Sequence, residues 1–492
     1  MNAPIHAQQL TKPQSAPVWA KPRLAHVSGF RALEQELDYS VANTQIQGRI
    51  PEELRGTFFR IGPGRNEIGG QKFGHWFDGD GMLHRVTFND DGIHYRNRYV
   101  RTPKYLKETE AQRIVYRSFG QNAPGGPLKN AGRVPANAAN TSLIWQGGHL
   151  LALWEGGRPW ELDPSTLETL GEVNYGGRLK PWNAFSAHGS VDPRTGHYYN
   201  FGVGVAPRGP GIHLYRVDPR GCLDRKGYFP IGSLPFCHDF ALTEHYAVFF
   251  VSPLRLRNPL KFAAGFSTFD ESLSYEPDDP VRVFVVSLDT FELVRTFETE
   301  AFVPVHYGNC WEEGRELVIN VTRFESWRVN ENLRNIFEAE NDEKGRLYEY
   351  RLDLASGGVR AQPLPGHDSL EFPQWDWRRS GVKTRISYAA AILPNATPGF
   401  FNGVQRLDQD SGAFQLHDFG PGRFTSELIF VPRSKEAAEE DGFLVAALYN
   451  AVTECSEIAV LNAQTLEELA VAPLQHHIPF GFHCGYTSRR FV

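Results

Sequence analysis

Four of the 17 histidines stand in contexts that suit metal ligation. They are His188 in NAFSAHGSVDP, His238 in PFCHDFAL, His306 in VPVHYGNCWEEG and His483 in IPFGFHCGY. Each follows small or apolar residues where a strand is expected to begin, and they are 50, 68 and 177 residues apart. Imidazole nitrogens bind Fe, Zn, Cu and Ni. A single such histidine is more often structural than a ligand, so a four-histidine metal centre depends on all four meeting. The adjacent His476 and His477 are alternatives to His483.

Three glutamates lie in similarly apolar segments: Glu155 in LLALWEGGRP, Glu371 in DSLEFPQWD and Glu427 in FTSELIFVPR. A carboxylate is costly to bury unless it has a partner. Four neutral imidazoles leave the full charge of a divalent cation in place, and outer carboxylates that accept the second ring N–H orient the rings and offset that charge. The three glutamates are therefore predicted to support the histidines. Asp239 is expected to secure the local turn or backbone, not to bind metal.

The elements that must position these side chains are short strands separated by Gly, Asp, Asn and Pro, whereas helical periodicity is scarce. Seven hairpins recur, each turning at an Asp or Asn whose side chain favours turns. Their turn residues are Asn89, Asp163, Asp218, Asp289, Asp353, Asp408 and Asn462. The separations of 74, 55, 71, 64, 55 and 54 residues predict a seven-bladed β-propeller. A large assembly of β-sandwiches is the alternative.

A propeller has a central axis, where side chains from different blades can meet although they are far apart in the sequence. An additional hairpin around Asp192 is interpreted as the inner pair of a blade, not as an eighth blade. Residues 1–24 are polar and Pro-rich and are predicted to form a flexible arm, with residues 25–492 as a single propeller domain.

Composition excludes several classes of protein. The 51 Lys and Arg against 57 Asp and Glu give a net charge of −6, and no basic run indicates a nucleic-acid partner. The five scattered cysteines include no CxxC pair, which argues against a disulfide framework and fits a reducing compartment. No apolar stretch approaches the roughly 20 residues that span a bilayer, and the N-terminus lacks the apolar core of a signal peptide. We expect a soluble cytoplasmic protein with no obligate protein partner.

A set of motifs, in this order, resembles the carotenoid cleavage oxygenase family over nearly the whole chain after the arm. They are GTFFRIGPGRNE (56–67), HWFDGDGML (75–83), ANTSLIWQGGHLLALWEGG (139–157), HDFALTEHYAVFF (238–250), VHYGNCWEEG (305–314), LEFPQ (370–374), SELIFVPR (426–433) and HHIPFGFHCGY (476–486). The resemblance implies a seven-bladed propeller with one Fe(II). It places the iron ligands at His188, His238, His306 and His483, and their supporting carboxylates at Glu155, Glu371 and Glu427.

Two motifs depart from the family pattern. VHYGNCWEE has Val before the histidine where relatives commonly have Phe, and GFHCGY has Cys after the histidine where Gly often follows. Both departures keep the ligand, and the roles of the nearby Cys310 and Cys484 stay open.

The implied reaction is oxidative cleavage of a C=C bond with O2 as co-substrate and no organic cofactor. NAPGGPLKNAGR (122–133) resembles apocarotenoid oxygenases more than stilbene-cleaving relatives, so an apolar polyene, a carotenoid or apocarotenoid, is the expected substrate. One alternative is a stilbene- or phenylpropene-cleaving oxygenase, in which Tyr105 with Lys129 or Arg133 would hold the phenol. Others are a non-catalytic apocarotenoid-binding propeller and an isomerohydrolase.

The segment SPLRLRNPLKFAAGFST (252–268) mixes apolar residues with Arg255, Arg257 and Lys261. It occupies the place where relatives carry an apolar insert that contacts membranes. Apolar side chains that enter the lipid and basic ones that meet anionic headgroups are typical of a monotopic contact. The sequence therefore predicts transient contact with a membrane surface near the entrance for substrate. The alternative is a cover that packs onto the propeller.

Overall fold

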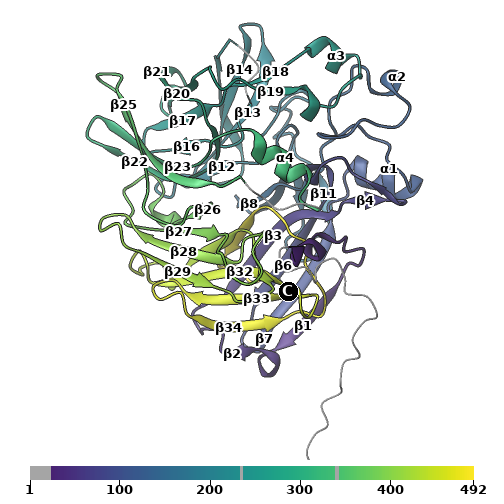
Figure 1. The fold of residues 1–492 in the computed structure, drawn as a ribbon, viewed down its shortest axis with the longest axis vertical. Helices are drawn as coiled ribbons and strands as arrows, with labels where there is room; N and C mark the ends of the chain where they lie inside the picture. The colour runs from purple at the N-terminus through teal and green to yellow at the C-terminus, as the bar shows by residue number, and fades with distance from the viewer. Residues whose placement is uncertain (1–23, 233–235, 338–342) are drawn as a thin grey trace, which may run out of the picture.

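The computed structural model describes residues 24–232, 236–337 and 343–492, so the predicted arm lies outside the described residues except for its last position. Seven antiparallel sheets of four or more strands form the framework of this part of the chain, which confirms the predicted seven-bladed propeller (Figure 1). That residues 25–492 form a single domain stays a prediction.

The blades follow one another along the chain, and the strands of each blade are named from the innermost outwards. Blade 1 contains β35 (Cys484–Thr487), β3 (Gly56–Arg65), β6 (Asp80–Phe88), β7 (Gly92–Tyr99) and β1 (Asp38–Ala42). Blade 2 contains β8 (Ser142–Gln146), β9 (His149–Leu153), β10 (Trp160–Leu162) and β11 (Thr169–Glu172). Blade 3 contains β12 (Gly189–Val191), β13 (Tyr198–Ala206), β14 (Gly209–Val217) and β15 (Leu223–Pro230). Blade 4 contains β16 (Ala241–Leu242), β17 (Tyr246–Val251), β20 (Val281–Ser287) and β21 (Leu293–Thr299).

The remaining three blades complete the ring. Blade 5 contains β22 (Val303–Glu313), β23 (Glu316–Phe324), β24 (Arg346–Asp353) and β25 (Val359–Pro363). Blade 6 contains β26 (Leu370–Gln374), β27 (Ile386–Ala391), β28 (Gly403–Asp408) and β29 (Phe414–Asp418). Blade 7 contains β30 (Arg423–Phe424) and β31 (Leu428–Pro432), which both pair with β32 (Gly442–Asn450), followed by β33 (Cys455–Asn462), β34 (Glu468–Pro473) and β2 (Gln47–Gly48).

The ring of blades is closed by two strands, one from each end of the chain. The C-terminal strand β35 is the inner strand of blade 1, and the N-terminal strand β2 is the outer strand of blade 7. Inner strands of successive blades adjoin around the axis, as β16 adjoins β22, β22 adjoins β26, and β31 adjoins β35, which adjoins β8. The axis is therefore built from segments that are hundreds of residues apart in the sequence.

All seven predicted hairpins form. Five of them are the outer pair of their blade, whereas in blades 1 and 7 a further strand, β1 or β2, pairs outside the hairpin. The turn chemistry is as expected at Asp163, whose Oδ1 accepts hydrogen bonds from the backbone N–H of Ser165 at 2.9 Å and of Thr166 at 2.7 Å. The hairpin around Asp192 joins β12 to β13 in blade 3, so it is an inner pair, as predicted.

The core lies between the faces of adjacent blades. Between blades 3 and 4, for example, Phe201 and Leu214 belong to the same buried cluster as Phe249 and Phe284. Alternation along each strand places one set of side chains against each neighbouring blade, which explains why so many strands are apolar on both faces.

In the described part of the chain, four short α-helices and two small hairpins lie between the strands of the blades. The helices are α1 (Pro103–Ala111), α2 (Pro127–Asn130), α3 (Pro259–Ala263) and α4 (Arg328–Arg334), and the hairpins pair β4 (Glu67–Ile68) with β5 (Gln71–Lys72) and β18 (Leu254–Leu256) with β19 (Leu273–Tyr275). Figure 1 shows α1, α2 and α3 on the same side of the propeller, at the right of the view. Among the described residues, we find no helix with the length and hydrophobicity needed to cross a bilayer.

Candidate metal centre

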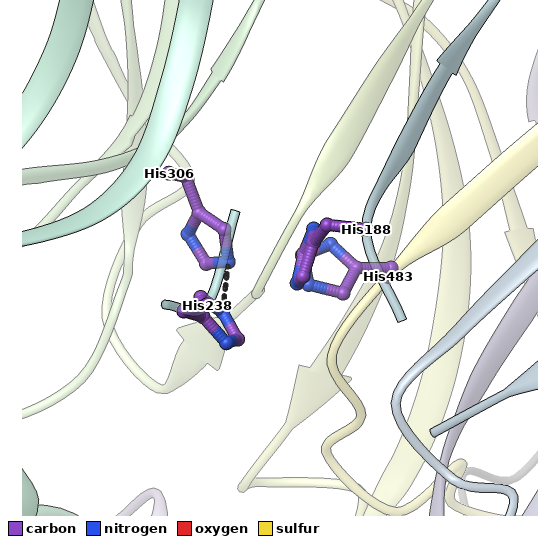
Figure 2. Close-up of side chains that lie close together, drawn as sticks. All are labelled: His188, His238, His306 and His483. Carbon is purple, nitrogen blue, oxygen red and sulfur yellow. Dashed lines mark hydrogen bonds between the residues drawn. The ribbon is translucent and has the colours of Figure 1, made fainter. Parts of the chain in front are cut away.

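The structure brings the four predicted histidines to one point on the propeller axis. His188 directly precedes β12, and His238 lies three residues before β16. His306 lies in β22, and His483 directly precedes β35; all four strands are the innermost of their blades. Each therefore comes from a different blade. One ring nitrogen from each lies within 4.8 Å of the corresponding nitrogens of the other three. The rings face one another in Figure 2.

The three predicted glutamates come from the three remaining blades. Glu155 follows β9 in blade 2, Glu371 lies in β26 of blade 6, and Glu427 precedes β31 in blade 7. Each carboxylate contacts the Nδ1 atom of one histidine. The contacts are Glu155 Oε1 to His238 at 2.9 Å, Glu371 Oε2 to His306 at 2.6 Å, and Glu427 Oε1 to His483 at 3.2 Å. All seven blades thus contribute one group to the site.

These contacts decide which nitrogen of each ring faces the axis. At His306 and His483 the Nδ1–H group donates a hydrogen bond to the carboxylate, which leaves a lone pair on Nε2. At His238 the short contact between Nδ1 and Glu155 favours the same arrangement. The Nε2 atoms of His238 and His306 are 3.2 Å apart, a contact that a shared proton or a cation can satisfy. The buried Nε2 atom of His188 has no hydrogen-bond partner in the described part of the chain.

This donor set fits a divalent transition metal. Metal–imidazole bonds are about 2.1 Å long, so nitrogens on opposite sides of an ion are about 4.2 Å apart. In the structure, the Nε2 atoms of His238 and His306 are 3.2 Å apart, and the ring nitrogens of all four histidines lie within 4.8 Å of one another. These separations are close to what such an ion would need. Imidazole nitrogens without thiolate or carboxylate in direct contact suit Fe, Zn, Cu or Ni better than Mg or Ca.

Burial keeps most of the site in the protonation state that metal binding needs. Burial, with the neighbouring histidines, lowers the pKa values of His188 and His306 well below the usual 6.5, so both rings are neutral at pH 7. Burial also lowers the pKa of His238, but Glu155 opposes it and the net shift is upward. Burial raises the pKa of Glu371 to about 7.

Asp239 secures the backbone, as predicted. Its Oδ1 atom accepts a hydrogen bond from the N–H of Phe240 at 2.7 Å, and its Oδ2 atom accepts one from the N–H of Tyr307 at 3.1 Å. The carboxylate therefore joins the segment that carries His238 to the strand that carries His306. Burial raises the pKa of Asp239 to about 6.

The sequence did not predict one further polar residue, Gln374. Its Nε2 atom donates a hydrogen bond to Glu427 Oε1 at 3.0 Å, the same oxygen that contacts His483. The signal was present in LEFPQ, because Pro inside a strand is typical of a bulge, where side chains change direction.

Other predicted residues have other roles. His476 and His477 lie away from the site, where their rings contact Tyr39 and the backbone oxygen of Arg31. The backbone N–H of Cys484 donates a hydrogen bond to Glu427, and Cys310 lines a cavity of about 180 Å³ beside the histidines. All five cysteines are unpaired.

The predicted phenol-binding residues do not form a common site. Tyr105 is buried in α1, where it stacks on Tyr99 at 4.7 Å and lies below the guanidinium group of Arg65 at 4.6 Å. Lys129 and Arg133 are exposed. This arrangement gives the stilbene alternative no support from these residues.

Comparison with known proteins places the chain in a family. The sequence profile of the retinal pigment epithelial membrane protein family matches residues 30–488. The chain belongs to the carotenoid cleavage oxygenase family. Members of this family are non-haem iron oxygenases, in agreement with the four-histidine site.

The similarity to individual members extends over almost the whole chain. The chain is 34% identical over 474 residues to apocarotenoid-15,15'-oxygenase of Synechocystis sp., covering 94% of this chain and 95% of that protein. It is 29% identical to carotenoid 9,10(9',10')-cleavage dioxygenase of Crocus sativus, covering 90% and 85%, and 28% identical to lignostilbene-alpha,beta-dioxygenase isozyme III of Sphingomonas paucimobilis, covering 92% and 95%. The structure of cobalt-substituted Synechocystis apocarotenoid oxygenase superimposes with a TM-score of 0.87 at 32% identity, covering 95% and 99%.

Proposed function

We propose that this protein is an iron(II)-dependent dioxygenase that cleaves one C=C bond of a carotenoid or apocarotenoid. In this proposal His188, His238, His306 and His483 are the iron ligands, and Glu155, Glu371 and Glu427 orient three of them. The observation that carries the proposal is the convergence of four imidazoles, three of them held by carboxylates, at one point on the axis.

The proposed reaction needs no other cofactor. Iron(II) held by four neutral imidazoles would supply the activation of O2 for addition to an alkene. The C=C bond breaks, and each oxygen atom of O2 becomes the oxygen of one carbonyl product, so no reductant is consumed. The protein has to hold one double bond beside the histidines and exclude water, because a polyene offers many similar double bonds.

A row of aromatic rings supports an apolar route to the histidines. It begins at Phe482, which precedes His483 in the sequence, and continues through Phe77, Phe119, Phe269 and Phe262, with centroid separations of 5.5, 5.6, 5.8 and 5.7 Å. Phe262 belongs to α3, in the segment that the sequence predicts to contact membranes. All of these rings except that of Phe482 are partly exposed, as expected for side chains along a substrate route.

Product analysis tests the reaction. The iron-loaded protein is incubated in air with an apocarotenal and, separately, with a hydroxystilbene, and the products are analysed by mass spectrometry. We expect two aldehydes or ketones from the polyene, whose masses locate the cleaved bond. Cleavage of the stilbene alone would move the protein to the stilbene-cleaving class. No product from either, with iron bound, would refute the oxygenase proposal in favour of a binding protein or an isomerase.

Metal analysis tests the ligand assignment independently of turnover. His238→Ala is expected to abolish both stoichiometric iron binding and activity, because it removes one of four converging donors. His213→Ala is the control, since His213 lies on β14 and stacks on Tyr215 at 6.0 Å. Full iron occupancy in His238→Ala would refute the assignment.

We also propose that α2 and α3 form a surface that contacts membranes transiently. Leu128, Leu260 and Phe266 are 96%, 84% and 64% exposed, and α3 is joined to the α2 segment by the hydrogen bond from Gly132 N–H to Ala263 O at 2.8 Å. Buried apolar side chains are the main contribution to binding of this kind. The basic contribution is smaller than the sequence indicates, because Arg255 and Arg257 form ion pairs with acidic residues.

Vesicle sedimentation tests this surface. The double variant Leu260→Ser with Phe266→Ser should bind phosphatidylcholine–phosphatidylserine vesicles several-fold more weakly, with iron content unchanged. Leu416→Ser is the matched control, because Leu416 is a 43% exposed leucine on β29, on the opposite side of Figure 1 from α3. Equal binding by the double variant and the control would refute the proposed surface.

A further inference from the structure

The inner strand of blade 6, β26, contains a β-bulge beside the metal centre. Glu371 pairs with Ala390 of β27, and Gln374 pairs with Tyr388, so two residues, Phe372 and Pro373, stand opposite one. Proline has no N–H to offer the sheet, which fits a position inside a bulge. The bulge lies between two residues that support the histidines.

The backbone of Phe372 is strained. Its φ angle is 55°, in the left-handed region that favours glycine and that side chains with a β-carbon rarely adopt. Strain of this kind persists only where the surroundings enforce it, and it is frequent at functional sites. Here the Phe372 N–H donates a hydrogen bond to the carboxylate of Glu371, the same Oε2 atom that contacts His306 Nδ1.

The bulge decides which way two supporting side chains point. In a regular strand, residues three apart lie on opposite faces. One additional residue reverses this alternation, so Glu371 and Gln374 both face the axis. Glu371 contacts His306 directly, and Gln374 contacts Glu427, which contacts His483. A strand without the bulge would lose one of these two supports.

The ring of Phe372 fills the space between the same two histidines. It stacks on His306 with a centroid separation of 5.1 Å and an interplanar angle of 26°, and it meets His483 edge-on at 5.7 Å. Its third ring contact is Phe401 at 5.5 Å. The side chain therefore restricts the tilt of both imidazoles directly.

We propose that the Phe372–Pro373 bulge orients half of the metal centre, with Phe372 and Gln374 as positioning residues for His306 and His483. Phe372 acts by ring packing and Gln374 acts through Glu427. The inference rests on the metal centre proposed above. It assigns a role to two residues that do not themselves bind the metal.

Cobalt binding tests the inference without turnover. Co(II) affinity is measured by competition with a chromophoric chelator, and the visible absorption bands of the cobalt protein report the geometry of its ligands. We expect Phe372→Ala and Gln374→Leu each to weaken Co(II) binding about tenfold or more and to shift the cobalt bands. If a residue has a merely structural role, its replacement would lower the melting temperature without shifting the cobalt absorption bands.

Phe291→Ala is the matched control. Phe291 is also a phenylalanine with a left-handed backbone, with a φ angle of 62°, but it is buried and lies in the outer hairpin of blade 4. Its replacement should lower stability and leave Co(II) affinity within about twofold of the unchanged protein.

The outcomes separate the inference from the proposed function. If the unchanged protein binds no Co(II), the metal centre itself is wrong. If it binds Co(II), and Phe372→Ala and Gln374→Leu keep its affinity within twofold and its absorption bands, the positioning role is wrong. If Phe372→Ala fails to fold, Gln374→Leu decides, because its side chain is partly exposed and its removal leaves the bulge in place.

Discussion

Replacing Glu371 and Glu155 one at a time should weaken metal binding by different amounts, because one carboxylate is buried and the other is partly exposed. Glu371 and Glu155 each contact one imidazole Nδ1 atom, at 2.6 and 2.9 Å. Their side chains are 8% and 35% exposed. Glu371→Gln and Glu155→Gln keep the shape of each side chain and remove its charge. Water can therefore reach and partly screen the charge of Glu155, whereas the carboxylate of Glu371 is shielded from solvent.

The structure sets the expected magnitudes. Loss of an outer partner of a metal-bound histidine lowers metal affinity about 10- to 100-fold, or about 1.4 to 2.8 kcal/mol. Glu371 should lie at the upper end, because its Oε2 atom also accepts the hydrogen bond from Phe372 N–H and because a buried charge interacts strongly with a cation. The loss of affinity in Glu155→Gln should be tenfold or less, since solvent screens the charge of Glu155.

Equilibrium competition for Co(II) at pH 8 measures both effects. This pH is above the pKa of about 7 to which burial raises Glu371, so the carboxylate of the unchanged protein is ionised. Glu349→Gln is the control, because Glu349 is another buried glutamate, with a side chain that is 10% exposed and contacts Arg351 at 2.8 Å in blade 5. The Co(II) affinity of Glu349→Gln should equal that of the unchanged protein. Equal losses at Glu371 and Glu155, or losses below threefold at Glu371, would refute the reasoning from burial.

Three other predictions concern groups outside the metal centre. Lys104→Met should destabilise the protein by about 3–5 kcal/mol in urea unfolding, because it leaves the carboxylates of Asp80 and Glu108 buried without this cation; a loss below about 1 kcal/mol would contradict this. Burial raises the pKa of Asp78 to about 7, so the folded protein retains a proton that the unfolded chain releases near pH 4, and stability falls as pH rises between these values. The melting temperature of Asp78→Asn relative to the unchanged protein should therefore rise from pH 5 to pH 8, and a constant difference would contradict it. Arg117→Met should speed proteolysis around α3, because the buried guanidinium of Arg117 donates hydrogen bonds to backbone oxygens of both the α2 and α3 segments; an unchanged cleavage pattern would show that these bonds do not hold α3.

Much of the fold could be predicted because its signals are local. A turn at Asp163 or Asn462 depends on side-chain hydrogen bonds within three residues, so the seven hairpins are readable without knowledge of their neighbours. The candidate histidines could likewise be chosen from short apolar contexts. The resemblance to a known family strengthened the expectation that all four meet, and in the structure their ring nitrogens lie within 4.8 Å of one another.

The pairing of supports with histidines could not be predicted. Glu155 of blade 2 contacts His238 of blade 4, and no feature near either residue indicates that partner. Gln374 was missed because its direction depends on the bulge at Phe372 and Pro373. A one-residue change of register turns a strand side chain to the other face, so such assignments require the pairing with β27 to be known.

The sequence by itself determined the number of blades, the set of seven chemical groups and the family, because turn formation and residue identity are properties of short segments. Only the tertiary structure decided that each blade contributes one of the seven groups, which carboxylate holds which imidazole, and which nitrogens face the axis. The physical reason is that ring closure joins β35 to β3 and β2 to β34, and thereby places at one point atoms whose relation depends on every blade between them.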